Sequence, residues 1–227
     1  TPTTEIYHLS LHAALPICPP RALHPIWIEA MRTRSWRLTL IVMATVLVGG
    51  CEAPITTPSS PTERTFLGAE ALRSVEIQVG AGARLPGSES SRQVGDWILA
   101  RLGEAGWQTE VQAFAWNGLA LRNLIGRSGP PDGAPIVLGA HYDTRPVADR
   151  DLDHPDLPVP GANDGASGVA VLIELARVID TDSLQQPVWL VFFDAEDGGN
   201  LPGGEWIVGS RYFAAHLAKV PTAVVVV

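Results

Sequence analysis

The chain has 227 residues, of which 46% are apolar and 18% are charged. This composition supplies enough apolar surface for a folded core and excludes a disordered chain. The net charge is -8 and no long run of lysine or arginine occurs, so nucleic acid is not an expected partner. The two cysteines, Cys18 and Cys51, are too few for a disulfide framework or a cysteine-based zinc site. Any bound metal must therefore be held by His, Asp or Glu.

Residues 31–50 have the layout of a signal peptide. Three arginines precede a mainly apolar run at 38–48, and small residues follow it. A run of this length suits the central region of a signal peptide, because a helix that spans a membrane needs about 20 apolar residues. We therefore expect residues 31–50 to direct export, with Met31 as the natural start.

Val48-Gly49-Gly50-Cys51 resembles the lipobox of bacterial lipoproteins, in which the cysteine becomes the lipidated first residue of the mature protein. The resemblance implies a lipid on Cys51, attachment to a lipid bilayer, and a location in the bacterial cell envelope, on its periplasmic or extracytoplasmic face. The alternative is an ordinary signal peptide with a chance cysteine, since short motifs also arise by chance.

The rest of the chain divides into three parts. Residues 1–30 contain several prolines and no sustained periodicity, so we expect a leader that is not native to the protein and takes no part in the fold. Residues 51–64 are rich in Pro, Ser and Thr, a composition that suits an extended tether. Residues 65–227 are periodic and are expected to fold.

Hydrophobic periodicity and turn residues predict alternating helices and strands from residue 65 onward. The clearest pattern is at 166–179, where four apolar residues fall on one face of a helix. Another helix is expected to begin at the cap residue Ser88 and to stop at Gly106. In chain order the expected elements are helices at 66–79 and 88–105, strands at 107–116, 119–126 and 136–140, a helix at 166–179, a strand at 187–193, a helix at 210–218 and a strand at 223–227.

This order predicts an α/β fold, a three-layer sandwich with a mostly parallel central sheet and helices on both faces. The uninterrupted apolar run at 187–193 fits a strand that is covered on both sides. Residues 223–227 also have the pattern of a buried central strand. Because such a strand normally leads into a functional loop, we expect the domain at 65–227 to be truncated at the C-terminus.

Polar residues adjoin three of the predicted apolar elements. They lie at 141–143 after a strand, at 161–168 before the helix at 166–179, and at 194–197 after the next strand. Ligands of α/β proteins bind outside the carboxyl ends of the strands. We therefore expect these three segments to converge on one site.

Five side chains in these segments are candidates for chemistry. His141 and Asp143 alternate at a strand end, so the carboxylate could orient the imidazole as it does beside a metal, although a histidine satisfied by backbone is the alternative. Asp164 is a candidate ligand or a simple helix cap. Glu196 and Asp197 could divide proton transfer and cation binding, or form a solvated acidic turn.

Four ordered motifs make the chain similar to the zinc-dependent metallopeptidase family twenty-eight, which holds aminopeptidases and glutaminyl-peptide cyclotransferases. The similarity covers about residues 66–227. It implies one or two zinc ions and peptide or protein amino termini as substrates. The motifs are His141-Tyr142-Asp143, the glycine-rich segment 160–168, Phe192-Phe193-Asp194-Ala195-Glu196-Asp197 and Gly209-Ser210-Arg211-Tyr212-Phe213.

The resemblance also implies roles for these residues. Asp164 corresponds to a zinc ligand, Asp197 to the next carboxylate ligand, and Glu196 to the catalytic acid/base. His141 corresponds to a ligand of the second zinc in aminopeptidases and is unbound in cyclotransferases, so the zinc count stays open. Asp143 is kept as a further catalytic candidate. Asp197 is shorter than the usual glutamate, and further ligands of the family would follow the last strand.

The long segment between Asp197 and Gly209 contains Trp206 and resembles the cyclotransferase branch. The expected function is therefore glutaminyl-peptide cyclotransferase, which forms pyroglutamate and releases ammonia. A zinc aminopeptidase that hydrolyses amino-terminal residues is the alternative, and a binding lipoprotein that has lost catalysis is a further one.

Overall fold

The computed structural model describes residues 64–227. The expected leader, the signal peptide, the lipobox with Cys51 and all but the last residue of the tether lie outside the described residues. None of the described helices is long and apolar enough to cross a membrane.

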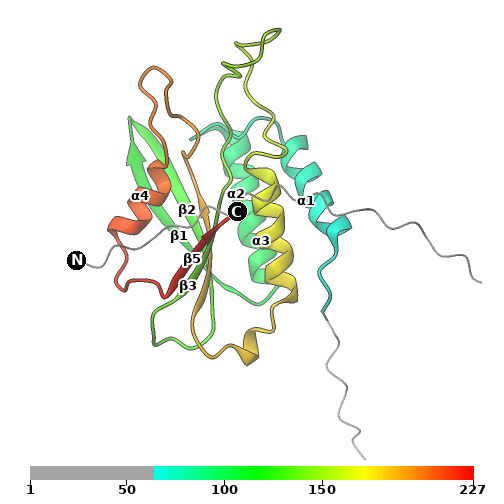
Figure 1. Ribbon diagram of the computed structural model, residues 1–227, viewed down its shortest axis with the longest axis vertical. Coiled ribbons are helices and arrows are strands. Elements are labelled where there is room, and N and C mark those ends of the chain that lie inside the picture. The colour runs from blue at the N-terminus through cyan, green and yellow to red at the C-terminus, as the bar shows by residue number, and fades with distance from the viewer. Residues whose placement is uncertain (1–63) are drawn as a thin grey trace, which may run out of the picture. The chain divides into compact units, whose positions relative to one another are not determined.

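A five-stranded sheet forms the centre of the described domain (Figure 1). Its order is β1-β2-β4-β3-β5. The pairs β1–β2 and β2–β4 are antiparallel, whereas β3–β4 and β3–β5 are parallel, so the parallel part is confined to the last three strands of that order. The strands are β1 at Gln108–Trp116, β2 at Leu119–Ser128, β3 at Ile136–His141, β4 at Val188–Phe193 and β5 at Ala223–Val226.

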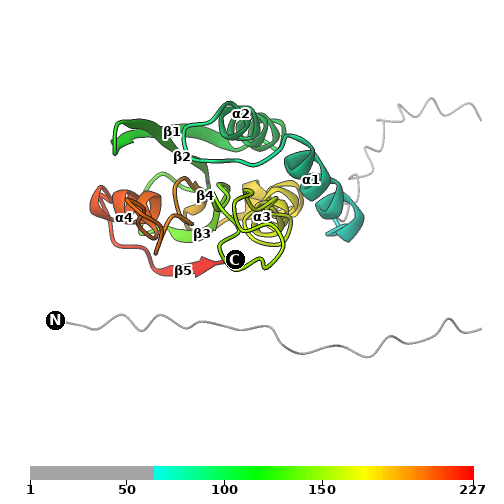
Figure 2. The same ribbon diagram turned by 90° about the horizontal axis from the view of Figure 1, so that it is seen from above.

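Helices cover both faces of this sheet, as predicted (Figure 2). The helices α2 and α3 pack on one face, α1 packs against α3, and α4 lies on the other face. The bounds are α1 at Gly68–Gly80, α2 at Glu89–Glu104, α3 at Ala166–Val178 and α4 at Val208–Ala215, with a short 3-10 helix η1 at Thr181–Ser183. The predicted three-layer α/β fold is confirmed, with a mixed sheet of two parallel and two antiparallel pairings where a mostly parallel one was expected.

The core lies in two layers because β4 is apolar on both sides. Leu190 and Phe192 pack with α2 and α3 on one face, whereas Val191 and Phe193 pack with Phe213 of α4 on the other. All four β4 side chains are buried, and each such side chain contributes roughly 1.5–3 kcal/mol to folding. This two-sided burial explains the uninterrupted apolar run.

Local sequence chemistry sets several boundaries where it was expected to. The Ser88 hydroxyl accepts a hydrogen bond from the Ser91 N–H at 3.1 Å and caps α2. Gly106, with a φ of 85°, follows the C-terminus of α2. Asn117 and Gly118 have φ values of 48° and 78°, which is the geometry of a tight two-residue turn between antiparallel strands.

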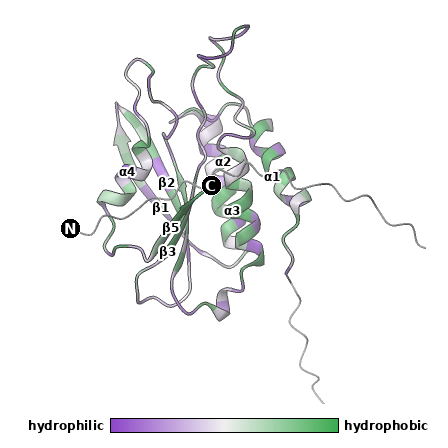
Figure 3. Ribbon diagram, in the orientation of Figure 1, coloured by the Kyte–Doolittle hydropathy of each residue, from purple (hydrophilic) through white to green (hydrophobic). Residues whose placement is uncertain are grey.

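The last strand differs from its prediction. Residues 223–227 were expected to form a buried central strand, but β5 lies at the edge of the described sheet, where β3 is its only strand neighbour within residues 64–227. Val224 and Val226 are 58% and 67% exposed. Figure 3 shows β5 as a continuous hydrophobic strand. Its pattern predicted a strand correctly, but burial depends on neighbours that the pattern does not specify.

Candidate active site

The three polar segments converge at one edge of the sheet. Strands β3 and β4 are parallel neighbours, and His141 at the end of β3 is in register with Phe193 at the end of β4. The segments that follow both strands therefore meet, together with the loop that leads into α3. The expectation that 141–143, 161–168 and 194–197 come together agrees with this geometry.

His141 and Asp164 are in direct contact. The Nε2 atom of His141 lies 2.8 Å from Oδ1 of Asp164, and this hydrogen bond lowers the pKa of the aspartate. Burial lowers the pKa of His141, but the carboxylates of Asp143 and Asp164 outweigh it, so the pKa is raised to about 10. Asp164 does not cap α3, because the cap residue is Gly165. Its carboxylate is therefore free for a role in the site.

Asp143 is completely buried and bonds to backbone. Its two carboxylate oxygens accept hydrogen bonds from the Glu196 N–H at 3.0 Å each, and one of them also accepts from the Asp197 N–H at 3.2 Å. His141 Nδ1 lies 3.5 Å from Asp143, too far for a good hydrogen bond, so their interaction is electrostatic. Asp143 therefore holds the segment that carries Glu196, and a catalytic role for it stays a prediction.

Glu196 and Asp197 do not form a solvated acidic turn. Asp197 is 7% exposed and Glu196 is half-buried. Burial raises the pKa of Glu196, and the carboxylates of Asp143, Asp197 and Asp164 raise it further, whereas His141 acts in the opposite direction. A raised pKa makes a carboxyl a better proton acceptor, which suits a group that takes up and returns a proton in general acid/base catalysis.

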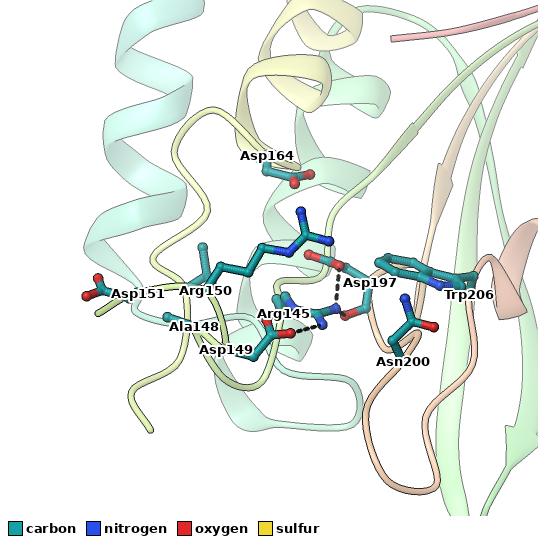
Figure 4. Close-up of a pocket in the computed structure, with 10 residues that line it drawn as sticks. Arg145, Ala148, Asp149, Arg150, Asp151, Asp164, Asp197, Asn200 and Trp206 are labelled. Atoms are coloured by element: carbon teal, nitrogen blue, oxygen red, sulfur yellow. Dashed lines mark hydrogen bonds and ion pairs between the residues drawn. The ribbon is translucent and has the colours of Figure 1, made fainter. Parts of the chain in front are cut away.

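Asp164 and Asp197 line the same cavity, which has a volume of about 430 Å³ (Figure 4). Arg145 and Trp206 also line it. Arg145 donates a hydrogen bond to Oδ1 of Asp197 at 3.2 Å and pairs with both oxygens of Asp149 at 2.6 and 2.9 Å. Its guanidinium lies 5.4 Å from the centre of the Trp206 ring. The cavity lining therefore combines charged side chains with the aromatic ring of Trp206.

Two arginines of the site region were missed by the sequence analysis. Arg145 lies two residues after the segment 141–143, and an arginine within an acidic stretch was the available signal. Arg84 gave no signal. It is fully buried, and it donates to the carbonyls of Tyr142, Pro160 and Gly161 at 2.9, 3.1 and 2.7 Å. Burial lowers the pKa of Arg84 to about 10.

The donor chemistry of the site suits zinc, for which imidazole nitrogen and carboxylate oxygen are common ligands. His141 and Asp164 already touch, and Asp197 faces the same cavity as Asp164. Within residues 64–227, however, no group of three His, Cys, Asp or Glu side chains is arranged to hold a metal ion. The described residues therefore supply only part of a zinc ligand set.

The fold and the site together define an α/β protein with a histidine–carboxylate centre at the carboxyl edge of its sheet. Residues 123–227 match the model of Peptidase family M28, the family that the motifs of the chain resemble.

Relatives of both enzymatic types are found. The glutaminyl-peptide cyclotransferase of Bos taurus is 30% identical over 155 residues, which are 61% of this chain and 42% of that protein. The crystal structure of Tannerella forsythia glutaminyl cyclase is 33% identical with a TM-score of 0.63, over 71% of this chain and 61% of that one. The structure of a leucine aminopeptidase precursor from Bacteroides thetaiotaomicron is 34% identical with a TM-score of 0.62, over 68% and 58%. The chain spans between 21% and 42% of the curated relatives it matches.

Gly161 provides a test of how tightly the loop before α3 is packed. It has a φ of 65°, and a Cβ atom there would lie 2.6 Å from Nη2 of Arg84 and would overlap Thr144. Gly82 has a φ of 89° but only an ordinary contact nearby. We expect Gly82→Ala to lower the free energy of unfolding by about 1–2 kcal/mol through backbone strain alone, and Gly161→Ala by a further ~1–3 kcal/mol through overpacking.

Denaturant unfolding of the purified protein measures both changes. Equal losses for the two variants would show that the Arg84–Thr144–Gly161 contact is not tightly packed.

Proposed function

We propose that the full-length protein is a zinc-dependent enzyme that acts on peptide amino termini, and specifically a glutaminyl-peptide cyclotransferase. The observation that carries the proposal is the half-buried Glu196, whose pKa is raised, beside two carboxylates that line one cavity. The match of residues 123–227 to Peptidase family M28 and the cyclotransferase relatives support it.

The segment after Asp197 favours the cyclotransferase over the peptidase. Asp197 and Trp206 form an antiparallel β-bridge, which closes the loop between them and places Trp206 in the cavity wall (Figure 4). This long, Trp-containing loop is the feature that resembles cyclotransferases. The leucine aminopeptidase precursor has a similar TM-score, so aminopeptidase activity is the second candidate.

In the cyclotransferase reaction, the α-amine of an amino-terminal glutamine attacks its own γ-amide carbon, and ammonia leaves. Asp164, Asp197 and ligands outside the described residues would hold zinc, which when bound polarises the γ-carbonyl. Glu196 accepts the proton that the α-amine loses and delivers it to the departing nitrogen. In the aminopeptidase alternative, Glu196 instead takes a proton from the water that attacks the peptide carbonyl.

Replacing Glu196 and Asp164 separates proton transfer from metal binding. We expect Glu196→Gln to keep the zinc content and to lower turnover by roughly 100- to 10,000-fold, the usual contribution of general acid/base catalysis. Asp164→Ala should lose zinc because a ligand is removed. The exposed Glu76 on α1 offers a matched control, Glu76→Gln, that should change neither quantity. Wild-type turnover in Glu196→Gln would contradict the mechanism.

The product identifies the reaction. We expect a peptide with amino-terminal glutamine to release ammonia without chain cleavage, which an ammonia assay and mass spectrometry of the peptide would measure together. Free amino acid in place of ammonia would assign the aminopeptidase. Neither product from a zinc-loaded, full-length protein would indicate a binding lipoprotein.

We also propose that Cys51 carries a lipid and anchors the protein in the bacterial cell envelope, on the strength of the lipobox-like motif. Expression in bacteria with labelled fatty acid should label the wild-type protein. Cys51→Ser should abolish the label. Equal labelling of wild type and Cys51→Ser would refute the anchor.

A further inference from the structure

Two buried carboxylates accept hydrogen bonds from three consecutive backbone N–H groups around Glu196. Asp194 Oδ1 accepts from Ala195 at 3.0 Å. Asp143 accepts from Glu196 at 3.0 Å and from Asp197 at 3.2 Å. Asp143 and Asp194 are 0% and 2% exposed, so neither carboxylate can contact a substrate.

The backbone that these carboxylates hold is bent. Ala195 has a φ of 53°, a left-handed conformation that costs a non-glycine residue about 1–2 kcal/mol and persists only where surrounding contacts enforce it. The carbonyls of Ala195 and Glu196 accept hydrogen bonds from Val208 and Ile207 at 3.0 and 2.9 Å. Both the N–H and the C=O groups at the bend are therefore fixed.

Each carboxylate is itself tied to the sheet. Asp194 Oδ2 accepts from the Tyr142 hydroxyl at 3.1 Å and from the Arg122 N–H at 3.2 Å, and the Asp194 N–H donates to Asn123 at 3.2 Å. Asp143 lies two residues after the end of β3. The position of the bend is thus fixed by β2 and by the segment after β3, whereas Glu196 itself follows β4.

We propose that Asp143 and Asp194 are positioning residues that form an amide clamp, which fixes the backbone of Glu196 relative to Asp164 and the cavity. The clamp acts through main-chain N–H groups and not through the Glu196 carboxyl. Its catalytic consequence rests on the proposed function, whereas its effect on the backbone does not.

The clamp needs carboxylates, because only a carboxylate offers acceptors on both oxygens. Asp143 receives N–H groups on both oxygens, and Asp194 receives three donors in all. An asparagine at position 194 turns an NH₂ group toward the N–H of Ala195 or of Arg122 and leaves that buried amide unsatisfied. At position 143 it leaves one oxygen to accept from both the Glu196 and the Asp197 N–H groups. The substitution to asparagine therefore preserves the shape of the side chain and weakens the clamp, more at Asp194 than at Asp143.

The test compares Asp194→Asn and Asp143→Asn in the full-length protein. We expect faster hydrogen–deuterium exchange at amides 195–197, with unchanged exchange in α2, and a fall in kcat of about 10- to 100-fold, the scale of a small misplacement of a catalytic group. The KM for a glutamine peptide and the zinc content should stay near wild type in Asp194→Asn. Asp194 is the sharper test because Asp143 also lies near His141. Asp132→Asn, at an exposed turn residue, is the matched control.

The outcomes separate the clamp from the proposed function. Unchanged exchange at 195–197 in Asp194→Asn overturns the clamp, and faster exchange with full kcat overturns its catalytic role. Faster exchange in a protein whose wild type yields neither ammonia nor free amino acid upholds the clamp and refutes the function. If the asparagine variants fail to fold, Tyr142→Phe removes one donor to Asp194 and should produce a smaller, local rise in exchange; no rise would count against the clamp.

Discussion

The buried guanidinium of Arg84 is the interaction on which the candidate site depends. Among residues 64–227 it forms no ion pair with a carboxylate, and it donates to backbone carbonyls of the segment after β3 and of the loop before α3. A buried charge is tolerated only when its donors are satisfied, so these carbonyls must stay where they are. His141 adjoins one of these segments and Asp164 follows the other. Arg84 therefore holds the two segments in the positions at which His141 and Asp164 make contact.

The charged side chains of the site differ in how deeply they are buried. Asp143 and Asp194 are buried beneath the backbone of residues 195–197, whereas Asp164, Asp197 and Arg145 line the cavity. Glu196 lies between the two groups. Burial and neighbouring carboxylates make its ionised form less favourable, and such opposed environments for nearby carboxyls are a usual feature of sites that move protons.

Much of the fold follows from local sequence chemistry, as Ser88 at the start of α2 and Asn117-Gly118 between β1 and β2 illustrate. The convergence of the three polar segments was also predictable, because strands β3 and β4 each end in a polar run. The burial of β5 was not, since the same valines fit a covered or an open strand. Arg84 and the acceptors on Asp143 were not predictable either, because their bonds join residues more than 50 positions apart.

The open side of β5 carries a further consequence. Within residues 64–227, the exposed valines of β5 lie on an edge where no further strand pairs. Such an edge can pair with an extended chain, and pairing between copies strengthens with concentration. A recombinant piece limited to the described residues should therefore self-associate as it is concentrated. The solubility of that piece would then depend on the exposed edge of β5 and not on the residues of the site at the ends of the strands.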